Sequence, residues 1–291
     1  MLIIQKMEVI KLSSNEEIIK NFILENKEQL KNLTLKQIAA KIYVSPAALV
    51  VFAKKLGYSG WNQFKEDFIL ELQYLNSHFQ QIDANIPFNS QDNIMKIANK
   101  IGTLQKETID DTLTLLDHDS LQQALTLIKN CSAIYLFGTS MSYIAAQEFS
   151  YAMKRLGMPV EFCLDPIEQV FQTHTLPSDA LAIIISYTGE TSPVVNACQI
   201  LQKRKIATIT ITSTGDNTIN KYSDVSLYLC TRENVHSKIS SFSSRQSIHT
   251  ILDILYSCYF ALNYQNNYQK TITMNKTIEL KRYSSNIKIN Q

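Results

Sequence analysis

The sequence predicts an all-α N-terminal domain followed by an α/β domain, in which helices flank a five-stranded parallel sheet. Three observations indicate this fold class. Apolar residues recur at helical spacing through residues 1–75. From residue 131 onward, uninterrupted apolar strands alternate with helices, as in parallel sheets that are covered on both faces. A chain of 291 residues also has the length of about two domains.

The composition and the charge distribution of the chain indicate which class of protein it belongs to. Apolar residues make up 45% of the chain and charged residues 19%, which is ordinary for a globular protein. Residues 1–75 contain ten lysines and eight acids, so the net charge of +2 lies in this part. Charged Lys6, Glu8 and Lys11 interrupt the early apolar run, and no stretch has the ~20 apolar residues that span a bilayer. We therefore expect a cytoplasmic protein that does not enter a membrane.

The five cysteines are odd in number, widely spaced and set in apolar contexts. This pattern favours reduced core thiols over disulfides or a metal site. We expect the protein to need neither a metal ion nor a cofactor.

Four helices are predicted within residues 1–75. Capping boxes, in which a Ser or Thr is followed three residues later by Glu or Gln, open the first two: Ser13 or Ser14 with Glu16 or Glu17, and Thr34 with Gln37. The third spans 45–57, with Ser45 as its N-cap, Pro46 in its first turn and Gly57 at the left-handed position after its end. The last has an apolar face: Trp61, Phe64, Phe68 and Leu72.

The second and third of these helices are joined by about three residues, with the small Ala39 and Ala40 near their crossing. This arrangement is typical of a helix-turn-helix. The inward face of the third helix is predicted to consist of Leu49, Phe52, Ala53 and Leu56. From spacing alone, a helical bundle that reads no DNA is the alternative.

The rest of the chain divides into three further segments: a linker at 76–90 that contains Pro87, an α/β domain at 91–264, and a polar tail at 265–291 that is either a partly ordered helix or loose. Two helices, about 91–115 and 119–130, precede the sheet, and Asp119 is the expected N-cap of the second. The five predicted strands are 133–137, 160–162, 181–186, 207–212 and 225–229.

Two strand ends in the α/β domain are rich in hydroxyl groups. The residues after the first strand read GTSMS, from Gly138 to Ser142, and those after the third read SYTGETS, from Ser186 to Ser192. Ligands of doubly wound sheets bind beyond the carboxyl ends of the strands. The GTSMS loop is not a dinucleotide-binding motif, because Ser140 stands where a glycine is required, and its hydroxyls suit a polyol better than a pyrophosphate.

The loop after the third strand has the features of a phosphate site. Ser186, Thr188 and Thr191 offer three hydroxyls within six residues, and Gly189 permits a tight turn. The next helix is predicted to begin near Thr191, so its unpaired N–H groups point back at the loop. The loop contains no Lys, so Glu190 is expected to point away or to act as a cap. An ordinary N-capping turn with coincidental hydroxyls is the alternative.

These motifs resemble the sugar isomerase (SIS) domain family: FGTSMS after the first strand, SYTGET after the third, close to S-x-S-G-E-T, and the final helix SRQSIHTILDILY. The N-terminal run LTLKQIAAKIYVSPAALVVFAKKLGYSGWNQFK extends the likeness. From about residue 10 to 264, the chain resembles an RpiR-type transcriptional regulator, which joins a helix-turn-helix to a SIS domain.

The resemblance implies a sheet of five parallel strands that binds phosphosugars. The phosphate would lie at Ser186, Thr188 and Thr191, helped by the amides of Tyr187 and Gly189; sugar hydroxyls or phosphate would lie at Thr139, Ser140 and Ser142. These regulators usually have Gly where Ser140 stands. Arg245, at the start of the last helix, is expected to reach the ligand or a neighbouring subunit.

The predicted recognition helix departs from the family pattern. These regulators usually have Thr where Ala48 stands and Arg where Val51 stands, and residues 1–75 contain no Arg. Bidentate reading of guanine by Arg is therefore excluded, and apolar contacts with thymine methyls in an A·T-rich operator are expected instead. The residues expected at the DNA are Lys36, Ser45, Ala47, Ala48, Val51, Lys54 and Lys55.

Two functions from different classes fit this sequence. The first is a cytoplasmic regulator of sugar metabolism, a homodimer or homotetramer that binds DNA and senses a phosphorylated sugar. The second is a phosphosugar isomerase with a helical appendage that reads no DNA. An isomerase needs a base such as Glu233, His236 or His174. Phosphosugar binding alone needs no base, so the sequence favours the regulator and predicts no catalytic residue.

Overall fold

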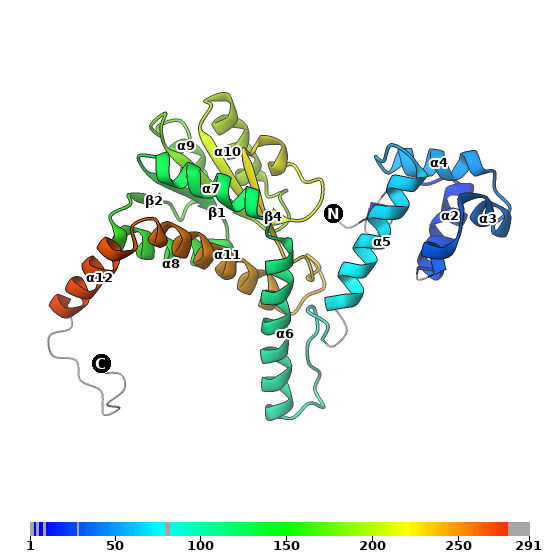
Figure 1. The fold of residues 1–291 in the computed structure, drawn as a ribbon, viewed down its shortest axis with the longest axis horizontal. Coiled ribbons are helices and arrows are strands. Elements are labelled where there is room, and N and C mark those ends of the chain that lie inside the picture. Colours follow the sequence, from blue (N-terminus) through cyan, green and yellow to red (C-terminus); the bar gives the residue numbers. More distant parts are fainter. Residues whose placement is uncertain (1–2, 4–5, 8–9, 28, 79–81, 279–291) are drawn as a thin grey trace. The chain divides into compact units, whose positions relative to one another are not determined.

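The computed structural model describes residues 3, 6–7, 10–27, 29–78 and 82–278. The chain divides into two compact units, one made of residues 1–83 and 214–216 and the other of residues 84–213 and 217–291. The first unit is all-α and the second is built on a five-stranded parallel sheet (Figure 1). The predicted fold class is confirmed.

Caps in the sequence determine where the helices of the first unit begin. Both predicted capping boxes form, with Ser13 and Glu16 before the first helix and Thr34 and Gln37 before the second. The helices enclose a core that includes Trp61. The elements are α2 (Ser14–Glu25), η1 (Gln29–Asn32), α3 (Leu35–Lys41), α4 (Pro46–Lys55) and α5 (Trp61–His78).

Helices α3 and α4 form the predicted helix-turn-helix. Their axes turn by 104° across the short connection, within the range usual for this motif. Ser45 caps α4 by accepting a hydrogen bond from the Ala48 N–H, and Gly57 takes the left-handed conformation after it, with φ +89°. The predicted inward face is confirmed, since each of its residues is buried: Leu49, Phe52, Ala53 and Leu56.

The sheet of the second unit has the strand order β2-β1-β3-β4-β5, with all neighbours parallel. The strands are β1 (Ile134–Gly138), β2 (Val160–Phe162), β3 (Leu181–Ser186), β4 (Ala207–Ser213) and β5 (Val225–Leu229). Chain direction across the sheet reverses between β1 and β3, because β1 leads outward to β2 while β3 leads to β4 and β5. Such a reversal opens a crevice beyond the carboxyl ends of the two central strands.

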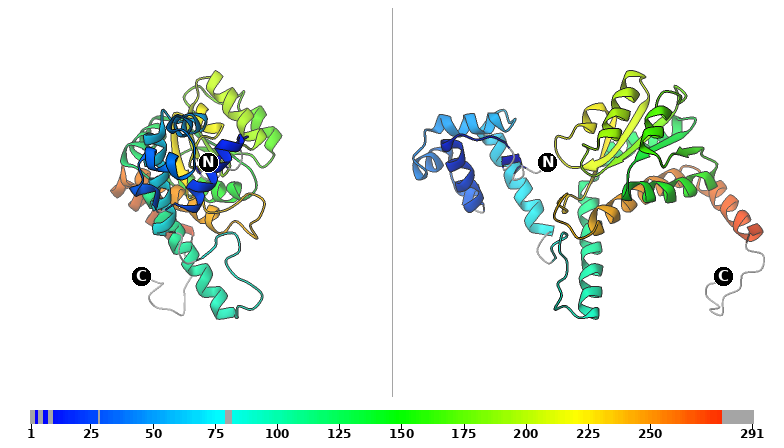
Figure 2. Two further views of the ribbon diagram at one scale, coloured as in Figure 1. Left: turned by 90° about the vertical axis from the view of Figure 1, so that its right-hand side faces the viewer. Right: turned by 180° about the vertical axis from the view of Figure 1, so that it is seen from behind.

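Helices cover both faces of the sheet, with α8 and α11 on one face and α9 and α10 on the other (Figures 1 and 2). Alternate residues of β3 serve the two cores: Ile183 and Ile185 pack in the first, Ala182 and Ile184 in the second. The helices are α6 (Ile94–Leu115), α7 (His118–Asn130), α8 (Met141–Leu156), α9 (Pro166–Gln172), α10 (Ser192–Lys203), η2 (Ile219–Tyr222), α11 (Phe242–Ala261) and α12 (Tyr264–Ile278).

Two details differ from the sequence-based expectations. The N-cap of α7 is Asp117, not Asp119, because the Asp117 carboxylate accepts the Ser120 N–H at 2.9 Å. Residues 84–90, which we expected to be linker, belong to the second unit, where Asn85 accepts a hydrogen bond from the Asn234 N–H at 2.6 Å. Of the two alternatives left open for the tail, the helix is the one observed: residues 265–278 belong to α12, and residues 279–291 lie outside the described part of the chain.

All five cysteines are free thiols. Burial raises the pKa of the Cys198 and Cys230 thiols to about 12, which makes both inert at neutral pH. Within the described segments, no single helix is long and apolar enough to cross a membrane, and one bent pair, α3 with α4, meets that test by length and composition only.

Candidate functional site

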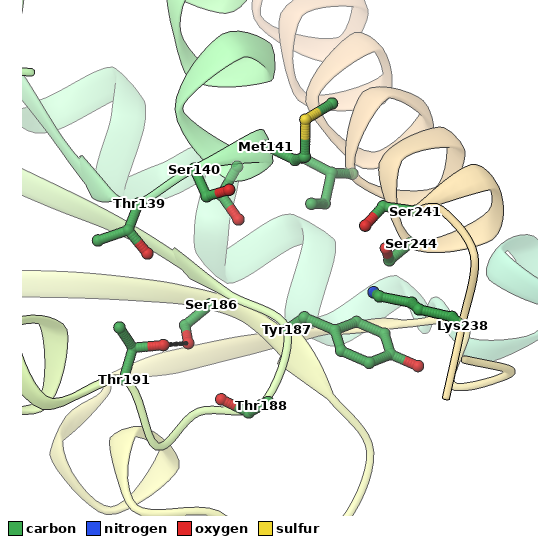
Figure 3. Close-up of a pocket in the computed structure, with 12 residues that line it drawn as sticks. Thr139, Ser140, Met141, Ser186, Tyr187, Thr188, Thr191, Lys238, Ser241 and Ser244 are labelled. Carbon is green, nitrogen blue, oxygen red and sulfur yellow. Dashed lines mark hydrogen bonds between the residues drawn. The ribbon is translucent and has the colours of Figure 1, made fainter. Parts of the chain in front are cut away.

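A cavity of about 160 Å³ lies where the loops after β1 and β3 meet, at the reversal point of the sheet. Hydroxyl groups from both loops point into it (Figure 3). The structure thus brings together seven of the nine predicted ligand residues: Thr139, Ser140, Ser142, Ser186, Tyr187, Thr188 and Thr191. The other lining residues are Met141, Lys238, Ser241, Ser244 and Ile248.

The loop after β3 is held in a tight turn by its own hydroxyls and by its neighbours. The Ser186 and Thr191 hydroxyl oxygens lie 3.2 Å apart, and the Ser186 hydroxyl accepts the Gly189 N–H at 3.2 Å. Gly189 has φ +68°, and its carbonyl accepts the Ile219 N–H. We call the hydroxyls of Ser186, Thr188 and Thr191 the hydroxyl cradle.

Glu190, the one acid in this loop, points away from the cavity as expected. Its carboxylate accepts the Thr218 N–H at 2.7 Å and the Thr218 hydroxyl at 2.6 Å, at the start of η2. The Glu190 carboxylate is therefore hydrogen-bonded at the start of η2, and the cradle contains only neutral hydrogen-bonding groups.

Two helix N-termini border the cavity without a side-chain cap. Ser140 precedes α8 and Thr191 precedes α10; neither side chain caps its helix, and neither first turn contains an acid. Unpaired N–H groups and the positive end of the helix dipole favour an anion at such a position. The cavity therefore favours an anion through dipoles and neutral donors.

The loop after β1 is fixed by a side chain that the sequence analysis did not single out. Gln169 on α9 is buried; its carbonyl accepts the Gly138 N–H at 3.1 Å, and its amide donates to the Gly138 carbonyl at 2.9 Å. Ser140 follows with φ +55° and ψ −126°, a conformation that glycine adopts far more readily. Ser140 is therefore a strained residue at the edge of the cavity.

The third wall of the cavity comes from the loop between β5 and α11. Lys238 is the one cationic residue among the described residues that line the cavity, and its ammonium lies 5.1 Å from the centre of the Tyr187 ring (Figure 3). The Tyr187 hydroxyl accepts the Glu233 N–H and donates to the Glu233 carbonyl, and burial raises the pKa of this phenol above its usual range. Tyr187 is thus held in place as a wall of the cavity, and its hydroxyl is already hydrogen-bonded to the Glu233 backbone.

Glu233 is buried beside this wall and caps α11. Its carboxylate accepts the N–H and hydroxyl of Ser244 at 3.0 and 2.6 Å, and it pairs with Lys238 at 2.8 Å. The N-terminus of α11 therefore already holds an anion that belongs to the protein. Because the Glu233 charge offsets that of Lys238, the side chains around the cavity are close to neutral.

Two of the predicted ligand residues, Gly189 and Arg245, do not line the cavity. The Gly189 N–H donates inside the loop to Ser186, and Arg245 lies in the first turn of α11, half-buried. The candidate bases of the isomerase hypothesis do not line it either. Glu233 is occupied as a cap, and His236 and His174 are exposed elsewhere on the unit.

The predicted DNA-binding residues lie on α3, on α4 and at Ser45, the N-cap before α4. All of them are exposed except Ala48, which is half-buried and packs on the core. Val51 is 58% exposed. The Lys55 ammonium lies 2.6 Å from Glu16, and this bond, with that from the Ser13 N–H, lowers the pKa of the Glu16 carboxyl to about 2. Lys54 makes no ion pair among the described residues.

Comparison with known proteins places both units. Residues 127–258 match the family model of the SIS domain, and residues 1–74 match that of the helix-turn-helix domain, rpiR family. An uncharacterised HTH-type transcriptional regulator of Caldanaerobacter subterraneus subsp. tengcongensis is 26% identical over 242 residues, which are 83% of this chain and 84% of that protein.

Solved structures share the fold. The Vibrio vulnificus NanR protein complexed with ManNAc-6P superposes with a TM-score of 0.60 at 18% identity, over 95% of this chain and 98% of that chain. The phosphoheptose isomerase of Neisseria gonorrhoeae superposes with a TM-score of 0.51 at 14% identity, over 58% of this chain and 100% of that chain.

Proposed function

We propose that this chain, which belongs to the RpiR-type transcriptional regulators with an N-terminal helix-turn-helix and a SIS domain, binds DNA through the first domain and senses a phosphorylated sugar through the second. The single observation that carries the proposal is the hydroxyl cradle between two uncapped helix N-termini. The complex of the Vibrio vulnificus NanR protein with ManNAc-6P supports this ligand class. We assign DNA binding to residues 1–75 and ligand binding to 91–264, and we place the protein in the cytoplasm.

The phosphate is assigned to the cradle and not to the N-terminus of α11. A phosphate dianion needs several donors, and the hydroxyls of Ser186, Thr188 and Thr191 supply three next to the start of α10. At α11 the Glu233 carboxylate already accepts the available N–H groups. The sugar then extends toward Thr139, Ser140 and Ser142 on one side and toward Lys238 and Ser244 on the other.

Replacing Thr188 by Val is expected to weaken sugar phosphate binding about ten-fold or more. Valine keeps the shape of threonine and removes one donor to a charged group, an interaction of about 1.5–3 kcal/mol. Isothermal titration with a panel of hexose and N-acetylhexosamine 6-phosphates measures the change. Thr126→Val is the matched control, because Thr126 lies exposed on α7 and its hydroxyl bonds only within that helix. Equal affinities of all three proteins would remove Thr188 from the site.

The two lysines at the end of α4 are expected to differ in their contribution to DNA binding. Among the described residues Lys54 makes no ion pair, whereas Lys55 is held by Glu16 at 2.6 Å. Lys54→Ala should therefore lower the dependence of log K on log salt by about one per DNA-binding domain, as expected for the loss of one phosphate contact. Lys55→Ala should change the slope less. Titrations of duplex DNA at several salt concentrations measure both, and a larger effect of Lys55→Ala would contradict this assignment.

The functional experiment combines both ligands. We propose that the protein acts as a homodimer or homotetramer on an A·T-rich operator and that ligand binding changes the spacing of the DNA-binding domains. A duplex enriched from a random library by the wild-type protein should be retained in a gel shift, and one sugar phosphate from the panel should change that affinity. Failure to enrich any duplex would refute the DNA-binding half of the proposal.

A phosphosugar isomerase is the second candidate, favoured by the fold shared with the phosphoheptose isomerase of Neisseria gonorrhoeae. It requires a base at the substrate, and none of the described residues lining the cavity is a carboxylate or a histidine. We therefore propose that the chain binds its ligand without converting it. Aldose–ketose turnover by the wild-type protein that is lost in Glu233→Gln would support the isomerase instead.

A further inference from the structure

The turn between α3 and α4 contains a tyrosine at a backbone position that usually takes glycine. Tyr43 has φ +57° and follows the C-cap of α3, and the next N–H, that of Val44, donates back to the Ala39 carbonyl at 3.0 Å. The same helix ending follows α4 and α8, where the left-handed residues are Gly57 and Gly157. A tyrosine in this conformation is strained relative to glycine.

Strain by itself does not mark a site, because Lys205 after α10 has the same φ of +57° in an ordinary helix ending. What distinguishes Tyr43 is its side chain, which is 97% exposed. Within the described residues the Tyr43 side chain makes no hydrogen bond, ion pair or ring contact. The side chain therefore gains no interaction among the described residues that would offset the strain of its backbone conformation.

The position of Tyr43 in the helix-turn-helix indicates a partner for its side chain. It stands two residues before Ser45, the N-cap of α4, and the N-terminal end of the second helix of a helix-turn-helix is the part that meets DNA. The phosphates that border the groove lie beside that end, and tyrosine hydroxyls are among the ordinary donors to them. The surface needs such donors, because residues 1–75 contain no Arg and Lys55 is held by Glu16.

We infer that Tyr43 contacts DNA, its hydroxyl donating a hydrogen bond to a phosphate oxygen at the edge of the groove that α4 enters. The inference rests on the DNA-binding half of the proposed function. The closed turn directs the side chain, because the bond from Val44 to Ala39 fixes the backbone on which the ring stands.

The test compares Tyr43→Phe and Tyr43→Gly with the wild-type protein on a duplex that the wild-type protein has enriched from a random library. Tyr43→Phe should lower the affinity about five-fold, the effect of one lost hydrogen bond. The dependence on salt should stay unchanged, because a neutral hydroxyl releases no counterion. Tyr43→Gly should bind DNA at least as weakly while it melts at a higher temperature, because the strain is removed.

Lys205→Gly is the matched control: it relieves the same backbone strain in the second unit, so it should raise the melting temperature and leave DNA binding unchanged. Binding by Tyr43→Phe within two-fold of wild type would overturn the inference while the proposed function stands. A reduced salt slope in Tyr43→Phe would also overturn it, because a charge would then be involved. If the wild-type protein enriches no duplex, the proposed function fails and this inference fails with it.

Discussion

Replacing Gly189 by Ala is expected to destabilise the second unit by about 3 kcal/mol and to abolish sugar phosphate binding. Gly189 has φ +68°, and a Cβ atom added there would lie 2.3 Å from the Asn217 side-chain oxygen. Asn217 cannot move aside easily, because it is buried and its amide donates to the Ser213 carbonyl at 3.1 Å. The loop must therefore open, and the hydroxyl cradle loses its shape.

Gly102→Ala is the control for this substitution. Gly102 lies within α6, and a Cβ added there meets nothing within 4 Å, so alanine should stabilise this helix by up to about 1 kcal/mol. Urea denaturation followed by circular dichroism measures both variants. The one tryptophan, Trp61, lies in the first unit, so its fluorescence gives an internal reference that neither substitution should shift. If the Gly189→Ala variant kept the stability and the sugar phosphate binding of the wild-type protein, the tight turn at Gly189 would be refuted.

Glu233→Ala is expected to destabilise the second unit by about 3–5 kcal/mol, because it breaks a buried ion pair by removing one partner. The Glu233 carboxylate accepts the Ser244 N–H and hydroxyl, and it lies 2.8 Å from the ammonium of Lys238, whose side chain is only 19% exposed. Without Glu233 the described residues supply no carboxylate for the Lys238 ammonium and no side-chain cap for the start of α11. A melting temperature equal to that of the wild-type protein would contradict this role.

The Glu233→Gln variant separates the effect of the Glu233 charge from the role of Glu233 as the cap of α11. Glutamine keeps an acceptor for the Ser244 N–H but leaves the Lys238 charge without compensation next to the cavity. The potential in the cavity becomes more positive, so sugar phosphates should bind about five-fold more tightly in this variant. Isothermal titration measures the change. Weaker binding would mean that Glu233 contacts the ligand directly, as the isomerase hypothesis requires.

The fold and the two hydroxyl loops were predictable because their signals are local. The apolar run from Leu181 to Ile185 predicts a buried strand, the hydroxyls follow it directly, and Thr34, Gln37 and Ser45 are caps within four residues of what they cap. Parallel strands end at one edge of a sheet, so the loops after β1 and β3 were expected to meet.

The third wall of the cavity was not predictable, because it depends on contacts between residues far apart in the sequence. Lys238 and Ser244 reach the cavity only because Glu233 caps α11 and the Tyr187 hydroxyl bonds to the Glu233 backbone, a contact between residues 46 positions apart. Arg245 was predicted from its place at the start of α11, but the direction of a side chain on a helix depends on where the helix begins. The strained conformation of Tyr43 likewise leaves no mark in the sequence.

The most direct test of the central claim is a crystal structure of the protein with a hexose or N-acetylhexosamine 6-phosphate that shifts its melting temperature. We predict the phosphate within hydrogen-bonding distance of the Ser186, Thr188 and Thr191 hydroxyls, in front of the first turn of α10, with the sugar between Ser140 and Lys238. A phosphate bound at Lys238 and the start of α11, with the hydroxyl cradle empty, would contradict the account.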